Sequence, residues 1–530
     1  MRFTKLAFLA AAAVVGSLGA GCGARSGLYE LAKDAGQDVP PVVPPECEHD
    51  LDCEGFEDKC NPVTCNIGIG KCEVLAPIKC DDKDPCTEDA CDSTKGTCSF
   101  KPMAVDNDKD GHKGPVPGHA PGDLGSCGDD CDDTNAAAFP GNKEICDGVD
   151  NDCNKVVDDG ATFVPANQTD VQVDGDDAPA GPAGLAYSNS TKTGYMAGYW
   201  GTLAGKTHSF AQALSVTGEK IGPAIQVTLV NADASGGALV WTGDRYGIAW
   251  NDRRNGDYEI YFNQIGPDGT KLYPDLRITA ADGFSLYPQV AFNGLYFLIV
   301  WEDDREGAFG VYAQRVDLAG NLVGDNLRLT KIYGNFEAPV IAVGTHGVAV
   351  AWNQTTFNDE HKIQFQLFTP ELEPAGQVLD LTKTLSGTFP YLVWNKQSYV
   401  TAWFEPDESP YGVYGSVIDE SGAVTTAAKK ITQSPKRSRY PSLLPLGDRV
   451  MMMYSDNRDN NKGYELYARM YDAALEPLSP ETRITHAEGD SVYPIPSFGP
   501  AGDMGVLFRD DRQGGHHVYF TRLQCVTPGQ

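Results

Sequence analysis

Basic residues are scarce in this sequence. The 530-residue chain has 42 lysine and arginine residues against 73 aspartate and glutamate residues, which gives a formal net charge of -31. A chain of this charge repels polyanions, so the composition excludes a nucleic-acid-binding protein and offers no basic patch for an anionic lipid surface. The length allows two or more domains, or one large array of repeats.

Long apolar runs are lacking as well. The basic segment Met1–Lys5 precedes an apolar run, Leu6–Val15, that is too short to cross a bilayer. This arrangement is typical of a secretory signal peptide, which we predict at residues 1–21. The small residues Gly19–Gly21 stand directly before Cys22, and together they resemble the lipobox of bacterial lipoproteins.

The lipobox resemblance implies a lipid anchor on Cys22. Cleavage before this cysteine and its acylation would attach the chain to a membrane without a transmembrane helix, and a glycine at position 23 favours outer-membrane sorting in such lipoproteins. Residues 22–46 would then be a lipidated, proline-rich tether. The predicted location is the outer membrane or cell surface of a Gram-negative bacterium. The alternative is an ordinary secretory signal followed by a chance cysteine.

Known catalytic motifs are missing. The sequence has no H-E-x-x-H, no G-x-S-x-G, no P-loop and no S-x-D-x-G-x-x-W box of the sialidase type. His516 and His517 are adjacent, but on a strand their side chains point to opposite faces, which disfavours a shared metal ion. These absences favour a binding protein. The many carboxylates leave a polysaccharide hydrolase or lyase as the alternative.

Cysteine is absent between Cys153 and Cys525, and no two cysteines form a C-x-x-C pair. Most of the fifteen cysteines crowd into the first third of the chain, which favours disulfides in an oxidising compartment over zinc. Residues 47–101 repeat one spacing twice, so we predict duplicated modules that are too small for an apolar core and are held by disulfides. The two sets are Cys53, Cys60, Cys65 and Cys72, and Cys80, Cys86, Cys91 and Cys98.

Cys525 needs a separate explanation. The remaining predicted disulfide cysteines are Cys47, Cys127, Cys131, Cys146, Cys153 and Cys525. If each module pairs internally, Cys47 and Cys525 are left over, and a bond between them is one hypothesis. The others are a bond from Cys525 to a cysteine nearer residue 153, with the modules paired differently, and a free buried thiol.

Residues 102–162 form an acidic segment. Alternate acidic residues before a glycine, in "DNDKDGHK", resemble the start of an EF-hand loop, and "DNDCNKVVDD" offers a similar series. Alternate carboxylates on a tight loop direct their oxygens to one centre, which suits Ca²⁺. Neither loop has a glutamate at its twelfth position, so a closing ligand must come from elsewhere; the alternative is a solvated acidic linker. The predicted calcium ligands are Asp106, Asp108, Asp110, Asp150, Asp152, Asn154 and Asp158.

The stretch Asp129–Gly160 resembles the metal-binding motif named after the copper-binding surface protein MopE. The resemblance rests on the D-C-D-D start, Pro140-Gly141, Glu144 and the two cysteine-containing runs around Cys146 and Cys153. Copper is not carried over to this chain, because the candidate ligands are carboxylates and the two histidines of the segment are isolated among oxygen donors.

A period of 51 residues dominates the rest of the chain. Aromatic residues recur at this interval inside short apolar runs, and a seventh follows after 54: Tyr199, Trp250, Trp301, Trp352, Trp403, Tyr454 and Phe508. Each unit contains four short strand patterns and no helical period, which is typical of a β-propeller blade. We therefore predict a mainly β protein with a seven-bladed propeller at residues 163–525, preceded by a disulfide-rich, calcium-binding stalk.

The seventh unit lacks a fourth strand, and an orphan strand stands at the other end, Thr169–Gly175. This strand is predicted to complete the last blade and close the ring. Four blades share a W-x-D-x-R-like turn, interpreted as an Asp–Arg pair that fixes the turn, with a charged ligand-binding ring as the alternative. The turn residues are Asp252, Arg254, Asp303, Arg305, Asp456, Arg458, Asp510 and Arg512. The predicted function is a non-enzymatic surface lipoprotein whose propeller binds a protein or polysaccharide.

Overall fold

A computed structural model of the chain shows two compact units, Met1–Met103 and Ala104–Gln530, each of which is described by itself. The predicted signal peptide, Cys22 and the tether lie outside the described residues. No helix among the described residues is long and apolar enough to span a membrane. The structure describes residues 46–53, 58–123, 125–144, 149–155, 162–166, 169–175, 179–189, 193–228, 233–331, 334–383, 385–406, 411–459 and 463–526.

The first unit is held by disulfides around two hairpins. It contains the short helix η1 (Asp50–Cys53), the hairpin β1 (Val63–Asn66) with β2 (Lys71–Val74), and the hairpin β3 (Thr87–Asp92) with β4 (Thr97–Pro102). Its small buried cluster consists of Cys47, Cys53 and Cys65, so sulfur replaces the apolar core that such short modules lack.

The disulfide pairing corrects one hypothesis. Cys47 bonds with Cys65, so the hypothesised bond between Cys47 and Cys525 is wrong. The modules are not closed units either, because Cys60 of the first bonds with Cys91 of the second. The other pairs in this unit are Cys53–Cys72 and Cys80–Cys98. Cys86, Cys127 and Cys525 are also disulfide-bonded, which excludes a free thiol at Cys525.

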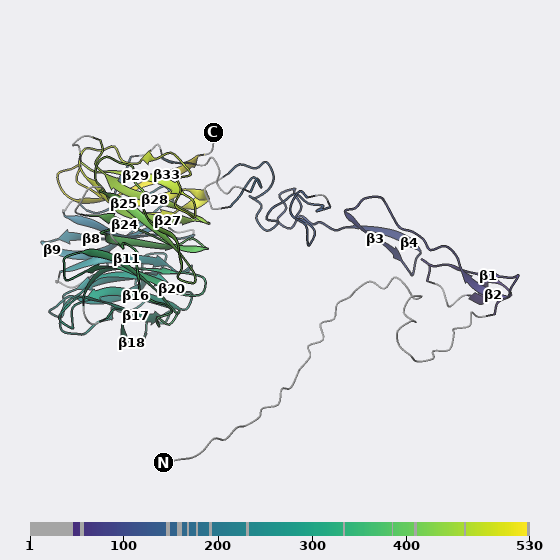
Figure 1. Cartoon of the computed structure of the whole chain (residues 1–530), viewed down its shortest axis with the longest axis horizontal. Coiled ribbons are helices and arrows are strands. Elements are labelled where there is room, and N and C mark those ends of the chain that lie inside the picture. Colours follow the sequence, from purple (N-terminus) through teal and green to yellow (C-terminus); the bar gives the residue numbers. More distant parts are fainter. Residues whose placement is uncertain are drawn as a thin grey trace, which may run out of the picture. The chain divides into compact units, whose positions relative to one another are not determined.

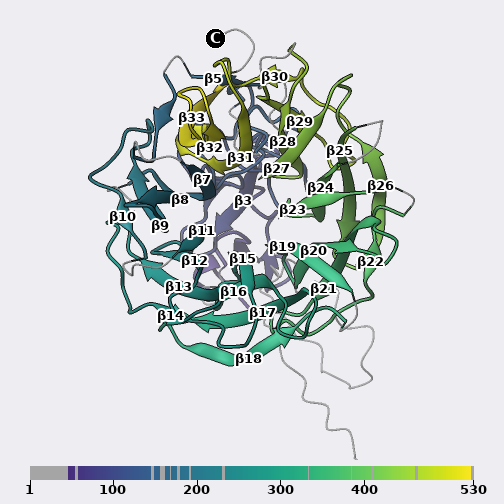
Figure 2. The same ribbon diagram turned by 90° about the vertical axis from the view of Figure 1, so that its left-hand side faces the viewer.

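The second unit contains the predicted seven-bladed β-propeller, in which each blade is one antiparallel sheet (Figures 1 and 2). Blade one is β7 (Ala180–Tyr187), β8 (Tyr195–Leu203), β9 (Lys206–Leu214) and β10 (Ile225–Gln226). Blade two is β11 (Ala234–Trp241), β12 (Tyr246–Asp252), β13 (Glu259–Ile265) and β14 (Leu276–Arg277). Blade three is β15 (Ser285–Phe292), β16 (Tyr296–Asp303), β17 (Gly310–Asp317) and β18 (Leu322–Arg328). Blade four is β19 (Asn335–Val343), β20 (Val348–Thr355), β21 (His361–Phe368) and β22 (Leu379–Asp380).

The last three blades follow the same order. Blade five is β23 (Thr388–Trp394), β24 (Ser398–Glu405), β25 (Gly412–Asp419) and β26 (Val424–Lys430). Blade six is β27 (Ser438–Leu446), β28 (Arg449–Asp456), β29 (Glu465–Tyr471) and β30 (Thr482–Arg483). Blade seven is β31 (Ser491–Phe498), the short helix η2 (Pro500–Gly502), β32 (Met504–Asp510) and β33 (His517–Val526), completed by β5 (Thr162–Pro165) and β6 (Val171–Gln172).

The repeating aromatics form the core between the blades. Trp250, Trp301, Trp352 and Trp403 are almost wholly buried, and each aromatic side chain removes about 150–250 Å² from water. One cluster joins Ile260 and Phe262 of blade two to residues of β16 in blade three, so each sheet packs its face against the next. The first strands lie nearest the centre and the fourth strands form the rim (Figure 2).

The ring closes through blade seven, as predicted. Strand β33 pairs with β6, where Tyr519 stands opposite Gln172, and this confirms the closing strand within Thr169–Gly175. A second strand that the sequence did not reveal, β5, extends the closure further along β33, where Cys525 stands opposite Phe163. The buried Asp174 accepts a hydrogen bond from the backbone N–H of Val518 and lies 3.0 Å from His517 Nδ1.

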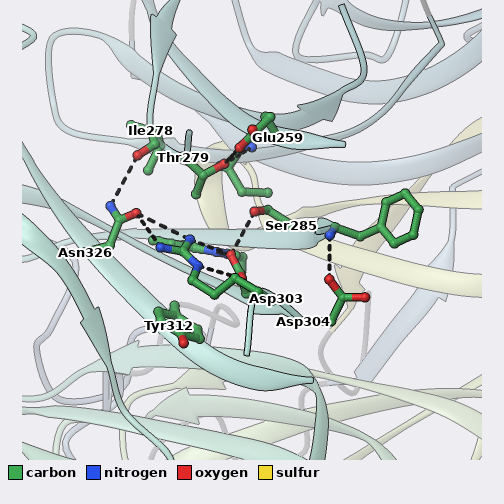
Figure 3. A network of polar contacts seen from close by, with 12 residues as sticks. Glu259, Ile278, Thr279, Ser285, Asp303, Asp304, Tyr312 and Asn326 are labelled. Carbon is green, nitrogen blue, oxygen red and sulfur yellow. Dashed lines mark hydrogen bonds and ion pairs between the residues drawn. The ribbon is translucent and has the colours of Figure 1, made fainter. Parts of the chain in front are cut away.

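The W-x-D-x-R turns contain the predicted Asp–Arg pairs, and Figure 3 shows the surroundings of Asp303 in blade three. In blade three, the guanidinium of Arg305 donates to both carboxylate oxygens of Asp303 at 2.7 and 2.6 Å. Ser285 and Trp301 donate to the same carboxylate at 2.8 and 2.9 Å. The guanidinium carbon lies 4.5 Å from the ring centroid of Tyr312. The buried carboxylate of Asp303 therefore accepts its hydrogen bonds from side chains within the fold.

The other three turns repeat this arrangement, with the pairs Asp252–Arg254, Asp456–Arg458 and Asp510–Arg512. Each of the four arginines also donates a hydrogen bond to a further side chain, nearer the outer edge of its blade. The pairs are Arg254–Asp275, Arg305–Asn326, Arg458–Glu481 and Arg512–Asp170. Asp170 precedes β6, so the N-terminal segment supplies in blade seven the partner that the fourth strand supplies elsewhere. Because these charges are satisfied internally, the turns serve the scaffold and do not form a free charged ring.

Candidate functional site

The first acidic loop, residues 106–111, is a tight turn organised by its own carboxylates. Asp106 accepts hydrogen bonds from the backbone N–H groups of Lys109, at 2.6 Å, and Gly111, at 3.2 Å. Lys109 and Gly111 both have positive φ, at 71° and 102°, which lets the chain turn sharply enough to gather three aspartates. Carboxylate oxygens of Asp106, Asp108 and Asp110 lie within 4.8 Å of one another.

Candidate closing ligands lie about twenty positions further along the chain. Oxygens of Asp130 and Asp133 lie within 4.8 Å of each other and of Asp108. Asp133 accepts a hydrogen bond from the backbone N–H of Asn107 at 2.8 Å, which ties its segment to the first loop. The sequence predicted that a closing ligand was needed but did not identify these two aspartates.

Asp130 is the most informative residue of this cluster, because its side chain is fully buried. Its relative exposure is 0%, and its Oδ1 accepts a hydrogen bond from the N–H of Asp132 at 2.8 Å. Within the part of the chain that the structure describes, its Oδ2 has no hydrogen-bond partner, and the same holds for Oδ2 of Asp108 and of Asp110. A buried carboxylate oxygen without a donor costs free energy unless a cation or another positive group contacts it.

The electrostatics of the cluster also favour a bound cation. Burial raises the pKa of the Asp130 carboxyl, and the negative charges of Asp110, Asp108 and Asp133 raise it further. His112, the nearest histidine in the sequence, is already engaged: its ring stacks on Phe139 at 4.9 Å and its Nδ1 lies 3.2 Å from Asp129. The donor set is therefore made of oxygen atoms, which fits a hard cation such as Ca²⁺ and not the nitrogen- and sulfur-rich sites that copper prefers.

A second acidic cluster joins Glu144 to Asp150 and Asp152, whose oxygens lie within 4.8 Å of one another. Asp150 accepts a hydrogen bond from the N–H of Lys155 at 2.6 Å, and Glu144 accepts one from the N–H of Asp152 at 2.9 Å. Glu144 was part of the motif resemblance but not of the predicted ligand set. The predicted ligand Asp158 lies outside the described residues, as does Cys146.

A disulfide, Cys131–Cys153, joins the two acidic clusters. Cys131 follows the buried Asp130, and Cys153 follows Asp152 of the second cluster. A sulfur atom in a disulfide is not a thiolate, so these two cysteines stabilise the loops and do not supply metal ligands. The backbone is packed closely here: a side chain at Gly128 would meet the carbonyl oxygen of Lys113 at 2.2 Å.

A separate titratable group, Glu302, lies in the propeller. It stands opposite Leu286 in blade three, is 5% exposed, and accepts a hydrogen bond from the N–H of Ala338 in blade four at 2.8 Å. Burial raises the pKa of Glu302 to about 7, and the charge of Glu337 contributes. A carboxyl group that is half protonated near neutral pH has the property required of a general acid.

Two segments of the chain match known family models, and one of them is the acidic segment. Residues 130–159 match a family model described as a "Putative metal-binding motif", and residues 79–103 match a Dictyostelium (slime mold) repeat. The chain is 45% identical over 56 residues to protein psiK of Dictyostelium discoideum, a match that covers 10% of this chain and 7% of psiK.

Solved structures similar to the propeller have low identity. A Dyadobacter fermentans protein of unknown function is 12% identical, with a TM-score of 0.41, over 69% of this chain and all of the other. The β-propeller domain of the trilobed protease from Pyrococcus furiosus is 9% identical, with a TM-score of 0.41, over 66% of this chain and 96% of that domain. An endo-arabinase from Bacteroides thetaiotaomicron is 12% identical, with a TM-score of 0.32, over 54% of this chain and 92% of the other.

Proposed function

We propose that this chain is an exported, non-enzymatic surface lipoprotein. In this proposal, a calcium-stabilised acidic segment carries a β-propeller that binds a protein or polysaccharide. One observation carries the calcium assignment: the fully buried Asp130 lies in a cluster with Asp108 and Asp133, and one of its carboxylate oxygens has no hydrogen-bond partner among the described residues. A divalent cation bound there would offset the mutual repulsion of the carboxylates and let the segment remain compact.

Calcium titration of Asp130→Asn tests the assignment. The substitution keeps the shape of the side chain and an oxygen at Oδ1 for the Asp132 N–H, but it removes the negative charge, so we expect calcium affinity to fall by about tenfold or more. Asp123→Ala, a change at an exposed aspartate of the same segment, is the matched control and should leave affinity unchanged.

Chelation provides a second readout of the same site. Calcium binds the folded segment, so its removal should speed proteolysis between Pro102 and Gly160 in the wild-type protein and have less effect in Asp130→Asn. Digestion that responds to neither chelator nor added calcium would reduce the segment to a charged linker. If the wild-type protein binds Cu²⁺ more tightly than Ca²⁺ and Asp130→Asn loses this binding, the site would be assigned to copper and not to calcium.

Cys22→Ala tests the lipid anchor. If this cysteine is acylated, the variant should remain unprocessed or move from the membrane fraction to the soluble fraction, because one or more acyl chains supply the membrane affinity. The measurement is cell fractionation with mass spectrometry of the mature N-terminus. Unchanged membrane retention of the variant, with no acyl group on the wild-type protein, would reject lipidation.

The alternative function is a polysaccharide hydrolase or lyase, and Glu302 is the observation that favours it. A buried carboxyl group with a pKa of about 7, next to Glu337, is suited to proton transfer. Reproducible glycan turnover by the propeller that Glu302→Gln abolishes would replace the binding function by this alternative.

A further inference from the structure

Four aromatic residues occupy an unusual backbone conformation in the first strands of the propeller. Each stands directly before a proline, within a β-bulge, and has a left-handed backbone. They are Tyr287, Phe389, Tyr440 and Tyr493, with φ of 49°, 49°, 53° and 57°. A residue other than glycine held in this region costs about 1–3 kcal/mol, and such positions are concentrated at functional sites.

The backbone itself does not require an aromatic side chain here. Blade two has Gly236 at the equivalent position, with φ of 96°, and blade four has Ala338, with φ of 48°. Two of the aromatic side chains also remain exposed to solvent, Tyr287 by 63% and Phe389 by 51%. The exposed parts of the Tyr287 and Phe389 rings are therefore available for a ligand, whereas Tyr440 also packs against the core cluster of blades five and six.

Three of these rings form a continuous row across blades five, six and seven, which we call the axial aromatic row: Phe389, Tyr440 and Tyr493. The ring of Tyr440 lies 5.9 Å from that of Phe389 and 4.0 Å from that of Tyr493. The row lies on the strands nearest the centre of the propeller (Figure 2). It lies at the end of those strands where β24, β28 and β32 finish, as the pairing of Ser438 with Asp456 in blade six shows.

Two arginines flank the row. The guanidinium carbon of Arg439 lies 3.7 Å from the ring centroid of Tyr464 and 4.9 Å from that of Tyr440. The guanidinium carbon of Arg509 lies 4.7 Å from the ring centroid of Tyr493. Among the described residues, neither arginine has an ion pair, and the buried Nε of each has no hydrogen-bond partner. The arginines of the repeat turns, by contrast, all have carboxylate partners.

Arginines without carboxylate partners are unexpected in a chain of net charge -31. A guanidinium offers a planar pair of N–H donors that matches a carboxylate. An aromatic face is negative at its centre and therefore packs well against the weakly positive C–H groups of a sugar ring. A ligand that combines a ring with a carboxylate would engage both features of the row.

We propose that the axial aromatic row, with Arg439 and Arg509, binds a carboxylate-bearing saccharide. The inference rests on the proposed function of the propeller as a binding module and names the class of its ligand. Sugar rings stack on the aromatic rings, and the uronate carboxylate pairs with the guanidinium groups.

The test measures binding of oligogalacturonate, oligoalginate and hyaluronan fragments to the full chain at fixed calcium concentration. At least one should bind, and Arg439→Gln or Arg509→Gln should weaken that binding by about tenfold or more, the loss expected for a charge-assisted hydrogen bond. Phe389→Ala should also weaken it. Arg315→Gln is the matched control, because Arg315 also lies over a tyrosine ring and has a buried Nε without a partner, but belongs to the third strand of blade three.

Several outcomes would overturn the inference. One is that no uronate oligomer binds; another is that Arg315→Gln weakens binding as much as Arg439→Gln does. Poly-glutamate that binds as tightly and with the same arginine dependence would assign the row to acidic peptides. Binding that disappears in Asp130→Asn would show that the saccharide binds through calcium at the acidic segment and not at the row. None of these results affects the calcium titration or the turnover assay, so failure here is distinguishable from failure of the proposed function.

Unchanged melting temperatures would show that the variants are folded.

Discussion

Replacing Cys525 by serine is expected to lower the free energy of unfolding of the propeller by about 2–5 kcal/mol while leaving its strand content unchanged. Cys525 is disulfide-bonded, and it lies in β33 opposite Phe163 of β5, where the ring closes. The bond restricts the unfolded chain, and it anchors the end of β33 at the closure. The hydrogen bonds between β5 and β33 do not depend on it, so the native sheet should remain at low temperature.

Thermal and denaturant unfolding, followed by circular dichroism, measure this effect. Cys131→Ser is the matched control, because it breaks a disulfide of the acidic segment, Cys131–Cys153, and should leave the unfolding of the propeller unchanged. Peptide mapping without reductant checks the premise: a Cys525 peptide that is alkylated in the native, unreduced protein contradicts it. Equal melting temperatures of wild type and Cys525→Ser would show that hydrogen bonding alone holds the closure.

Replacing Glu302 by glutamine should remove a pH dependence from the stability of the propeller. The pKa of Glu302 is about 7 in the folded protein and about 4.3 in an unfolded chain, so the folded state binds the proton more tightly. The resulting stability is complete below about pH 4 and is lost as the pH rises through 7. The loss by pH 8 amounts to about 4 kcal/mol at most. Glutamine has no charge to bury, so the variant should be the more stable protein at pH 8.

Denaturant unfolding at pH 5 and pH 8 measures the difference. The carbonyl oxygen of glutamine still accepts the hydrogen bond from Ala338, so the two proteins should be similar at pH 5. Glu371→Gln, at an exposed position of blade four, should leave the pH dependence unchanged. If wild type and Glu302→Gln lose stability in parallel between pH 5 and pH 8, burial of this carboxyl does not control the stability of the ring.

The architecture could be predicted from sequence because one physical requirement repeats every 51 residues. A large aromatic side chain must be buried between neighbouring sheets, so Trp250 and its equivalents recur in step. The closing strand was found in the same way, from the missing fourth strand of the last unit. Strand β5 was missed because a four-residue segment carries no comparable pattern and forms only where β33 extends beyond its blade.

The pairing of groups distant in sequence could not be predicted. The bond Cys60–Cys91 depends on how two modules approach each other, which spacing alone does not determine. Asp130 and Asp133 cluster with Asp108 because the chain returns to the first loop after about twenty residues. The axial aromatic row did leave a signal, since an aromatic residue directly precedes a proline at 390, 441 and 494. The sequence did not identify the row as a candidate ligand site, because that step needed the left-handed backbone and the arginines without ion pairs that the structure shows.

The closure of blade seven also constrains how the protein is made. Strand β33 pairs with β5 and β6, which are synthesised more than three hundred residues earlier, whereas the sheets of blades one to six form from contiguous stretches of chain. Local sheets form faster than pairings between distant segments. Six blades therefore have the opportunity to assemble in order during synthesis, before β5 and β6 find their partner. The ring becomes complete only after the last strand has been synthesised, so an exposed strand edge accompanies the chain until its synthesis is finished.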